Sequence, residues 1–136
     1  MKTTNYLNTF IEVAPDCPAA QGEIPPLKES GKTAANTQFG MIYDNPYRYT
    51  SDDVIFNVYT SKNNVSKREY DAAREKFFSK GQPCLRSSPL TKRYGWGIHS
   101  DATGKVALYA VESAGYKKMV KDKSLDHTKG VRSSKK

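Results

Sequence analysis

Side chains able to bind or react are concentrated in the segment from Lys76 to Ser100 and in the hairpin that follows it. No acidic residue occurs between Glu75 and Asp101. The same stretch contains five basic residues, which are Lys76, Lys80, Arg86, Lys92 and Arg93. Guanidinium, hydroxyl and backbone N–H donors in such a loop can hold a phosphate or a carboxylate. This segment therefore predicts a site for a small anion. The alternative is a surface loop whose charges are solvated, since the sequence has no phosphate-binding glycine motif.

The alternation of side chains predicts a β-hairpin over Arg93–His99 and Lys105–Val111. We expect His99 to lie opposite Lys105. One face of this hairpin is apolar, and alternation places Trp96 on it. We therefore expect Trp96 to be buried in the core.

The other face of the hairpin exposes the bare backbone of Gly95 and Gly97, onto which a ligand can lie closely. The alternatives are a helix packed over the glycines and a β-bulge. Cationic and aromatic side chains surround this floor and can bind an anion, stack on a ring or move a proton. The predicted ligand-binding site consists of Arg86, Arg93, Gly95, Gly97, His99 and Tyr109.

A small enzyme centred on Cys84 or His99 is an alternative function. Cationic neighbours make a thiol more reactive, and His99 would serve as its base if the fold brought the two together. The competing interpretation is that Cys84 is a small buried hydrophobe. Cys17 is a weaker candidate, and neither cysteine has a C-x-x-C or zinc spacing. We expect no metal ion and no cofactor, since His99 is the only histidine outside the predicted tail.

The net charge of +8 suggests nucleic-acid binding, but its distribution is uneven. Lys117 to Lys136 holds 8 basic and 2 acidic residues, whereas the preceding 116 residues hold 14 basic and 12 acidic ones. Most of the excess charge therefore belongs to a terminal helix and a predicted tail, which are often merely solvated. Nucleic-acid binding through the basic loop and this tail is thus an alternative to the small anionic ligand, and not the favoured one.

The apolar segments are short, and none approaches the ~20 residues of a membrane-spanning helix. The N-terminal residues lack the apolar core of a secretory signal. These features predict a cytoplasmic protein without a membrane partner, in which Cys17 and Cys84 are reduced.

The pattern of elements predicts an α+β protein, a two-layer sandwich in the order β-α-β-α-β-β-α with about four strands and three helices. The predicted strands are 6–14, 54–59 and the two of the hairpin. The predicted helices begin at the caps Thr33, Ser66 and Ser113. We expect residues 1–122 to form a single domain and residues 123–136 to form a basic flexible tail.

Long strings of the sequence resemble a family of small uncharacterised bacterial proteins, known as a domain of unknown function. The resemblance covers almost the whole chain. Its most specific strings are Lys80-Gly81-Gln82-Pro83-Cys84-Leu85-Arg86 and Ser88-Pro89-Leu90-Thr91-Lys92-Arg93-Tyr94-Gly95-Trp96-Gly97-Ile98-His99-Ser100-Asp101. A further string is Asn45-Pro46-Tyr47. The resemblance implies no activity and no catalytic residues.

Overall fold

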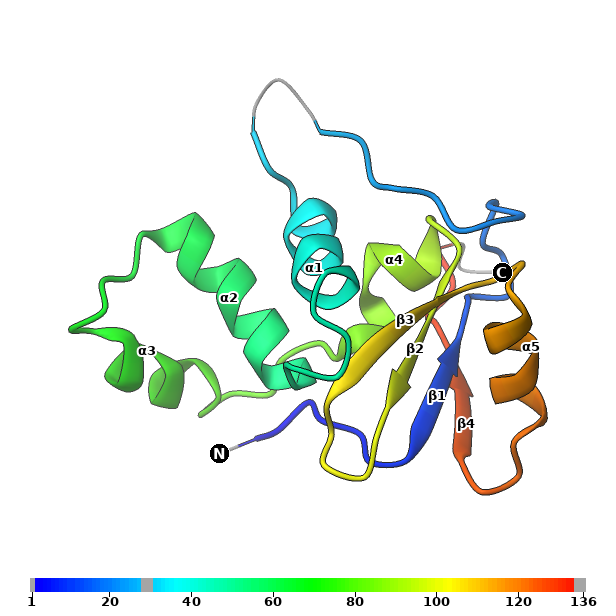
Figure 1. Ribbon diagram of the computed structural model, residues 1–136. Coiled ribbons are helices and arrows are strands. Elements are labelled where there is room, and N and C mark those ends of the chain that lie inside the picture. The colour runs from blue at the N-terminus through cyan, green and yellow to red at the C-terminus, as the bar shows by residue number, and fades with distance from the viewer. Residues whose placement is uncertain (1, 28–30, 134–136) are drawn as a thin grey trace.

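The computed structural model describes residues 2–27 and 31–133, and it has the predicted α+β class. Its centre is a four-stranded sheet in the order β3-β2-β1-β4 (Figure 1). The strands are β1 (Thr9–Glu12), β2 (Trp96–Ser100), β3 (Val106–Ala110) and β4 (Asp126–Lys129). The helices are α1 (Ala34–Tyr43), α2 (Ser51–Asn63), α3 (Tyr70–Phe77), the 3₁₀ turn η1 (Leu85–Ser87), α4 (Pro89–Lys92) and α5 (Ala114–Lys121).

Helices cover both faces of this sheet, so the predicted two-layer sandwich gains a third layer. Ile11, Trp96 and Ile98 point to one face and join the core with Ile42 of α1 and Leu90 of α4. The opposite face is covered by α5, at the right of Figure 1. The core face is therefore built from residues far apart in the sequence, as burial of a large apolar area requires.

The helix predicted from Thr33 is confirmed as α1. The Thr33 hydroxyl accepts a hydrogen bond from the backbone N–H of Asn36, and the Asn36 side chain accepts one from the backbone N–H of Thr33. This reciprocal capping box satisfies N–H groups that would otherwise lack a partner at the helix start. Ala35 and Ile42 on its inner face are buried.

The strand predicted over residues 54–59 is wrong, because this segment lies within α2. Thr50 caps the helix, and the carboxylate of Asp53 accepts a hydrogen bond from the Thr50 backbone N–H. A nearly continuous apolar run fits a buried strand and a buried helix equally well, and the cap decides between them. Val54 and Phe56 are both fully buried, which explains why neither the period of a strand nor that of an amphipathic helix stands out.

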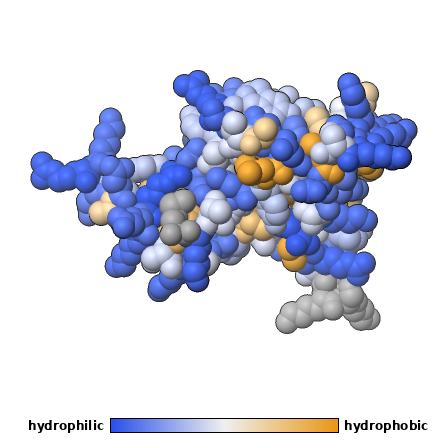
Figure 2. Space-filling view, turned by 90° about the horizontal axis from the view of Figure 1, so that it is seen from below, coloured by the Kyte–Doolittle hydropathy of each residue, from blue (hydrophilic) through white to orange (hydrophobic). Residues whose placement is uncertain are grey.

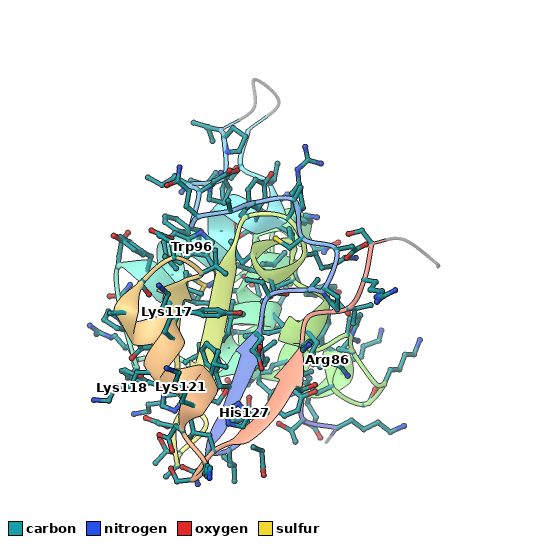
Figure 3. The ribbon with its side chains drawn as sticks, turned by 90° about the vertical axis from the view of Figure 1, so that its right-hand side faces the viewer. Arg86, Trp96, Lys117, Lys118, Lys121 and His127 are labelled. Carbon is teal, nitrogen blue, oxygen red and sulfur yellow. The ribbon has the colours of Figure 1, made fainter. Side chains whose placement is uncertain are left out.

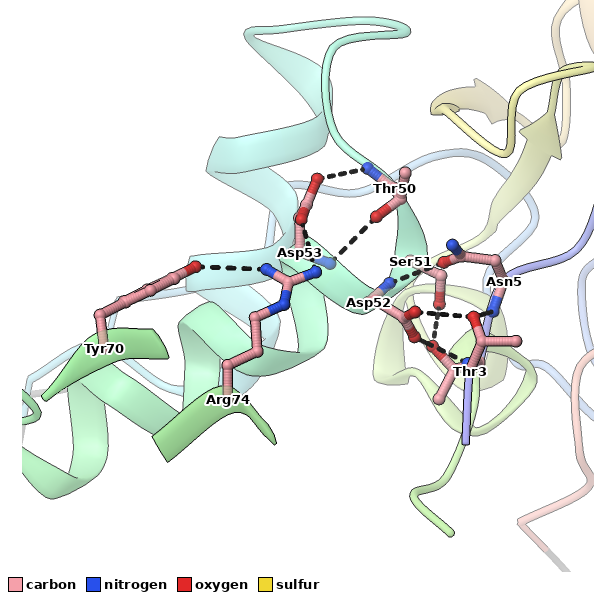
Figure 4. A network of polar contacts seen from close by, with 9 residues as sticks. Thr3, Asn5, Thr50, Ser51, Asp52, Asp53, Tyr70 and Arg74 are labelled. Atoms are coloured by element: carbon pink, nitrogen blue, oxygen red, sulfur yellow. Dashed lines mark hydrogen bonds and ion pairs between the residues drawn. The ribbon is translucent and has the colours of Figure 1, made fainter. Parts of the chain in front are cut away.

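A polar network joins the start of α2 to the N-terminal segment and to α3 (Figure 4). The Asp52 carboxylate is only 1% exposed and accepts hydrogen bonds from the Thr3 hydroxyl (2.6 Å) and the Thr4 backbone N–H (2.7 Å). The neighbouring Asp53 forms an ion pair with Arg74 of α3 at 2.9 Å. The two adjacent acids thus hold three parts of the chain together.

The predicted helix after Ser66 begins about one turn later, as α3. The Ser66 hydroxyl still donates to the Glu69 carboxylate at 2.8 Å, but the chain between them forms turns. Together α2 and α3 project from the side of the sheet, at the left of Figure 1. Seen from below, this projecting end is covered mainly by hydrophilic side chains (Figure 2).

The hairpin is confirmed, but its register differs by two residues from the prediction. His99 lies opposite Ala107 rather than Lys105, and Gly97 lies opposite Tyr109. A shift of two residues keeps every side chain on its predicted face, because the side-chain period of a strand is two. Trp96 is therefore buried as expected, at 7% exposure.

The chain after residue 122 departs from the predicted flexible tail, because residues 126–129 form β4. This strand lies parallel to β1, and the backbone N–H groups of Asp126 and Gly130 donate to the Asn8 and Glu12 carbonyl oxygens. Its residues are polar and largely exposed, since β4 is an edge strand. An edge strand of this kind carries no apolar pattern from which it can be predicted.

Candidate functional site

The predicted glycine floor is filled by aromatic rings. A Cβ atom added at Gly97 would lie 2.6 Å from Phe10 Cζ and 2.6 Å from Tyr116 Cε2. Tyr116 belongs to α5, so a helix residue packs directly over this glycine. Gly97 thus permits a close approach within the protein and leaves no open backbone for a ligand.

Gly95 and Arg93 lie outside the strand to which they were assigned. Gly95 has a φ of +80° and precedes β2, and an added Cβ would lie 2.5 Å from the Gln21 carbonyl oxygen. Arg93 ends α4 and is exposed. Neither residue shares the α5 face of the sheet with His99 and Tyr109.

The structure brings two predicted site residues, His99 and Tyr109, together through a third side chain, that of Tyr47. The Tyr47 hydroxyl lies 2.7 Å from His99 Nδ1 and 2.7 Å from the Tyr109 hydroxyl. Tyr47 has a φ of +60°, a left-handed conformation that is uncommon for a side chain of this size. Three segments of the chain therefore meet in one hydroxyl–imidazole network on the α5 face.

Burial governs the protonation of this network. It lowers the pKa of the His99 imidazole, while the carboxylates of Asp101 and Asp122 act in the opposite direction. Burial also raises the pKa of Tyr47 well above that of an ordinary tyrosine, and the hydrogen bond with Tyr109 adds to this effect. Near neutral pH the network consequently contains a neutral His99 imidazole and a protonated Tyr47 hydroxyl. Such a network can donate or accept a proton at His99, but it carries no positive charge for an anion.

A second imidazole, that of His127, lies on the same face. Phe10 of β1 pairs with His99 on one side and with His127 of β4 on the other. The three side chains therefore form one row across the sheet, with the aromatic ring between the imidazoles. His127 Nε2 is 2.7 Å from the Asp122 carbonyl oxygen at the end of α5.

Arg86, the remaining predicted site residue, lies at the opposite edge of the sheet from Tyr109. Its Nε–H donates to the Lys129 carbonyl oxygen of β4 at 2.7 Å. The backbone N–H of Val131 donates in turn to the Arg86 carbonyl oxygen. The loop that carries Arg86 is thus attached to the last strand, away from the predicted pocket.

The side chains of Lys117, Lys118 and Lys121 of α5 and of Arg86 lie on the side of the molecule shown in Figure 3. The register of β4 places Lys129 on the same face as His127. We refer to them as the basic surface, which consists of Lys117, Lys118, Lys121, Lys129 and Arg86. The three lysines of α5 are exposed and lie within an arc of about 100°, since an α-helix turns by about 100° per residue. The other side of α5 packs Tyr116 against the sheet. The helix therefore presents its charged side to solvent.

Of the acidic residues of this region, Glu12 lies on the same face, as the cross-strand partner of Lys129, whereas Asp126 is turned away and Asp122 is engaged. Asp126 alternates with His127 along β4 and points to the opposite face of the sheet. The Asp122 carboxylate accepts hydrogen bonds from the Ser124 hydroxyl (2.6 Å) and backbone N–H (2.9 Å). The basic surface consequently keeps a positive balance.

Cys84 and His99 have different partners, so the structure does not join them in a thiol–imidazole pair. The Cys84 Sγ lies 3.3 Å from the Tyr6 hydroxyl. Burial raises the pKa of Tyr6 and the Cys84 contact adds to this rise, while nearby Arg86 opposes it. Both Cys84 and Cys17 are free thiols.

Two features of this region escape sequence reasoning. Tyr47 lies in the loop after α1, where no periodicity shows which way a side chain points. The strand β4 is polar, so nothing in its composition shows that it pairs with β1. Only the string Asn45-Pro46-Tyr47 draws attention to the first of them.

Within residues 2–27 and 31–133, no three His, Cys, Asp or Glu side chains gather closely enough to hold a metal ion. In the same residues, no helix has the length and apolar character needed to cross a membrane.

Fold and site define an α+β protein whose mixed sheet carries a hydroxyl–imidazole network and a basic surface on one side. The chain belongs to a family of unknown function, DUF6157, whose model matches residues 1–136. No curated protein and no solved structure matches the chain. Membership supports the resemblance to a domain of unknown function and assigns no activity.

Proposed function

We propose that the protein binds nucleic acid through the basic surface of α5, β4 and Arg86. The observation that carries this proposal is that the lysines of α5 and Arg86 lie on one side of the molecule (Figure 3), where the register of β4 also places Lys129. Phosphate backbones are bound mainly by lysine and arginine side chains, independently of base sequence. The binding we propose is accordingly sequence-independent.

An extended polyanion suits this arrangement better than the small anionic ligand favoured by the sequence. The cations are spread over a helix, an edge strand and a loop instead of converging in a pocket, and Gly97 of the predicted floor is covered by Phe10 and Tyr116. A small anion would meet few of these charges at once. A nucleic-acid backbone can contact several of them.

A nucleic acid is also favoured over an anionic membrane surface. Helices that bind membranes insert a large apolar side into the lipid. The apolar side of α5 is already used, because Tyr116 packs on Phe10 with ring centroids 5.1 Å apart. The lysine side of α5 is open to a partner, and of its large apolar side chains Val120 is exposed, at 39%.

The test is the salt dependence of binding to a fluorescein-labelled duplex DNA, measured by fluorescence anisotropy. The triple variant Lys117→Gln/Lys118→Gln/Lys121→Gln should bind more weakly. The slope of log K against log salt should become shallower by about 0.9 for each phosphate that the variant no longer neutralises.

A charge-matched control distinguishes binding at the basic surface from an effect of the net charge of the protein. Lys62→Gln/Lys67→Gln/Arg68→Gln removes the same charge from the distant α2–α3 end, where all three side chains are exposed. It should retain nearly the wild-type slope. Equal weakening in both variants, or no binding at low salt, would overturn the proposal. So would tighter binding to phosphatidylserine vesicles than to DNA.

A further inference from the structure

A groove independent of the basic surface is lined by residues of α2 and α3. These two helices lie at the other end of the molecule from α5 and β4 (Figure 1). The groove has a volume of about 550 Å³, within the range of about 300–1,000 Å³ usual for small-molecule sites. Its lining residues come from both helices and from the segments that follow them. Those that matter for binding are Tyr59, Glu69, Ala73, Lys76, Phe77 and Lys80.

Two aromatic rings line the groove. The rings of Tyr59 and Phe77 have centroids 4.7 Å apart, and Tyr59 remains 36% exposed. Phe56 packs on both rings from the protein interior, where it is fully buried, and so restricts their positions. Exposed ring surface held in this way can stack against a planar ligand.

Charged groups at the rim favour a negative ligand. Lys76 and Lys80 line the groove and are exposed, whereas Glu69 is its one acidic lining residue. The Glu69 carboxylate accepts a hydrogen bond from the Ser66 hydroxyl at 2.8 Å, so one of its oxygens is engaged with the turn that precedes α3. The lysines therefore leave a net positive rim above an aromatic wall.

We propose that the groove binds a small aromatic anion, with its ring against Tyr59 and Phe77 and its acid group between Lys76 and Lys80. An aromatic carboxylate or sulfonate has both features. The small side chain of Ala73 leaves the space that such a ring needs.

The probe for the test is the anionic dye 1-anilinonaphthalene-8-sulfonate, whose fluorescence reports binding to the full chain. Ala73→Leu should fill the groove and weaken binding at least tenfold. Ala72→Leu is the matched control, since it adds the same atoms to the same helix at an exposed position that does not line the groove. Leucine is a good helix former, so both variants should fold.

A second comparison tests the charge. Lys76→Gln/Lys80→Gln should weaken binding of the dye several-fold at low salt and leave binding of uncharged N-phenyl-1-naphthylamine unchanged. Equal affinities of the wild type for the two dyes would overturn the anionic part of the proposal.

The location is tested by amide chemical shifts, which also serve if Ala73→Leu fails to fold. Dye-induced shifts should cluster at Asn63, Ala73 and Lys80. Shifts confined to α5 or β4, or equal dye binding by the two leucine variants, would overturn the site. A dimer that Ala73→Leu abolishes would assign the groove to a second copy and would also overturn it. DNA binding should be the same in Ala73→Leu as in the wild type.

Discussion

The face of the sheet that packs against α1 and α4 is filled by large apolar side chains, whereas the face under α5 is filled by two aromatic rings that close over a glycine. On the first face, the Trp96 indole packs against Phe39 and Tyr43 with ring centroids 5.4 and 5.6 Å away. On the second, Phe10 and Tyr116 occupy the space that a side chain at Gly97 would need. The packing of the first face depends on large side chains such as Trp96. The packing of the second face depends on the absence of a side chain at Gly97. Polar side chains can therefore gather around the second face without disturbing the core.

Removing volume from the first face should have the largest effect. Trp96→Ala is expected to lower the free energy of unfolding by roughly 3–5 kcal/mol, since it leaves a cavity and removes the hydrogen bond from the indole N–H to the Glu23 carbonyl oxygen. Urea unfolding followed by circular dichroism measures this decrease. Trp96→Phe should be less destabilised. An unchanged unfolding midpoint in Trp96→Ala would mean that this face does not depend on volume.

Removing the edge strand tests how far the second face depends on β4. A chain that ends at Asp122 should be less stable by roughly 2–4 kcal/mol, because each backbone hydrogen bond to β1 contributes about 1 kcal/mol. Thermal unfolding of the truncated and full chains provides the comparison. If the two chains unfold at the same temperature, residues after 122 behave as the tail that the sequence predicts.

Adding volume to the second face should have an intermediate effect. Gly97→Ala is expected to cost about 1–3 kcal/mol, because Phe10 and Tyr116 must move to admit a methyl group. Gly40→Ala is the control, since nothing lies within 4 Å of an added Cβ in this helix. It should stabilise the protein by about 0.4–1 kcal/mol. The same sign in both variants would remove the basis for the comparison of the two faces.

The smallest expected effect is a pH dependence of the free energy of unfolding, which arises from His99 on the second face. Because burial lowers the pKa of His99, the unfolded chain takes up this proton at a higher pH than the folded protein does. The free energy of unfolding should therefore decrease as the pH falls below about 6.5, the ordinary value of imidazole. Urea unfolding at several pH values should show a flatter dependence in His99→Gln. In His127→Gln, which changes an exposed imidazole, the dependence should remain.

Local signals are sufficient for part of this architecture. The caps at Thr33 and Ser113 predict α1 and α5, and alternation predicts both faces of the hairpin. Alternation does not determine register, because shifts of two residues give the same faces. Register is set by the turn and by contacts across the sheet, which a single sequence does not display.

Contacts between segments far apart in the chain could not be predicted from the sequence. The assignment of residues 54–59 to a strand followed their apolar character and overlooked the cap formed by Thr50 and Asp53. The predicted pocket failed to form because α5 covers Gly97, and nothing in the hairpin indicates which helix packs on it. His99 and Tyr109 do meet, since both belong to the same pair of strands. Tyr47 reaches them from a loop, and only the folded chain shows this.

The hydrogen bond between Arg86 and β4 has a consequence for self-association. An edge strand offers unpaired carbonyl and N–H groups to which another chain can add, and this is a common route to aggregation. In the parallel pairing with β1, Lys129 directs its carbonyl oxygen outward, and Arg86 occupies it. The next outward N–H, that of Val131, is taken by the Arg86 carbonyl oxygen. One residue thereby blocks the end of the edge against strand addition. An Arg86→Ala chain keeps the backbone contact with Val131 but exposes the Lys129 carbonyl oxygen, so it should form aggregates more readily during prolonged storage.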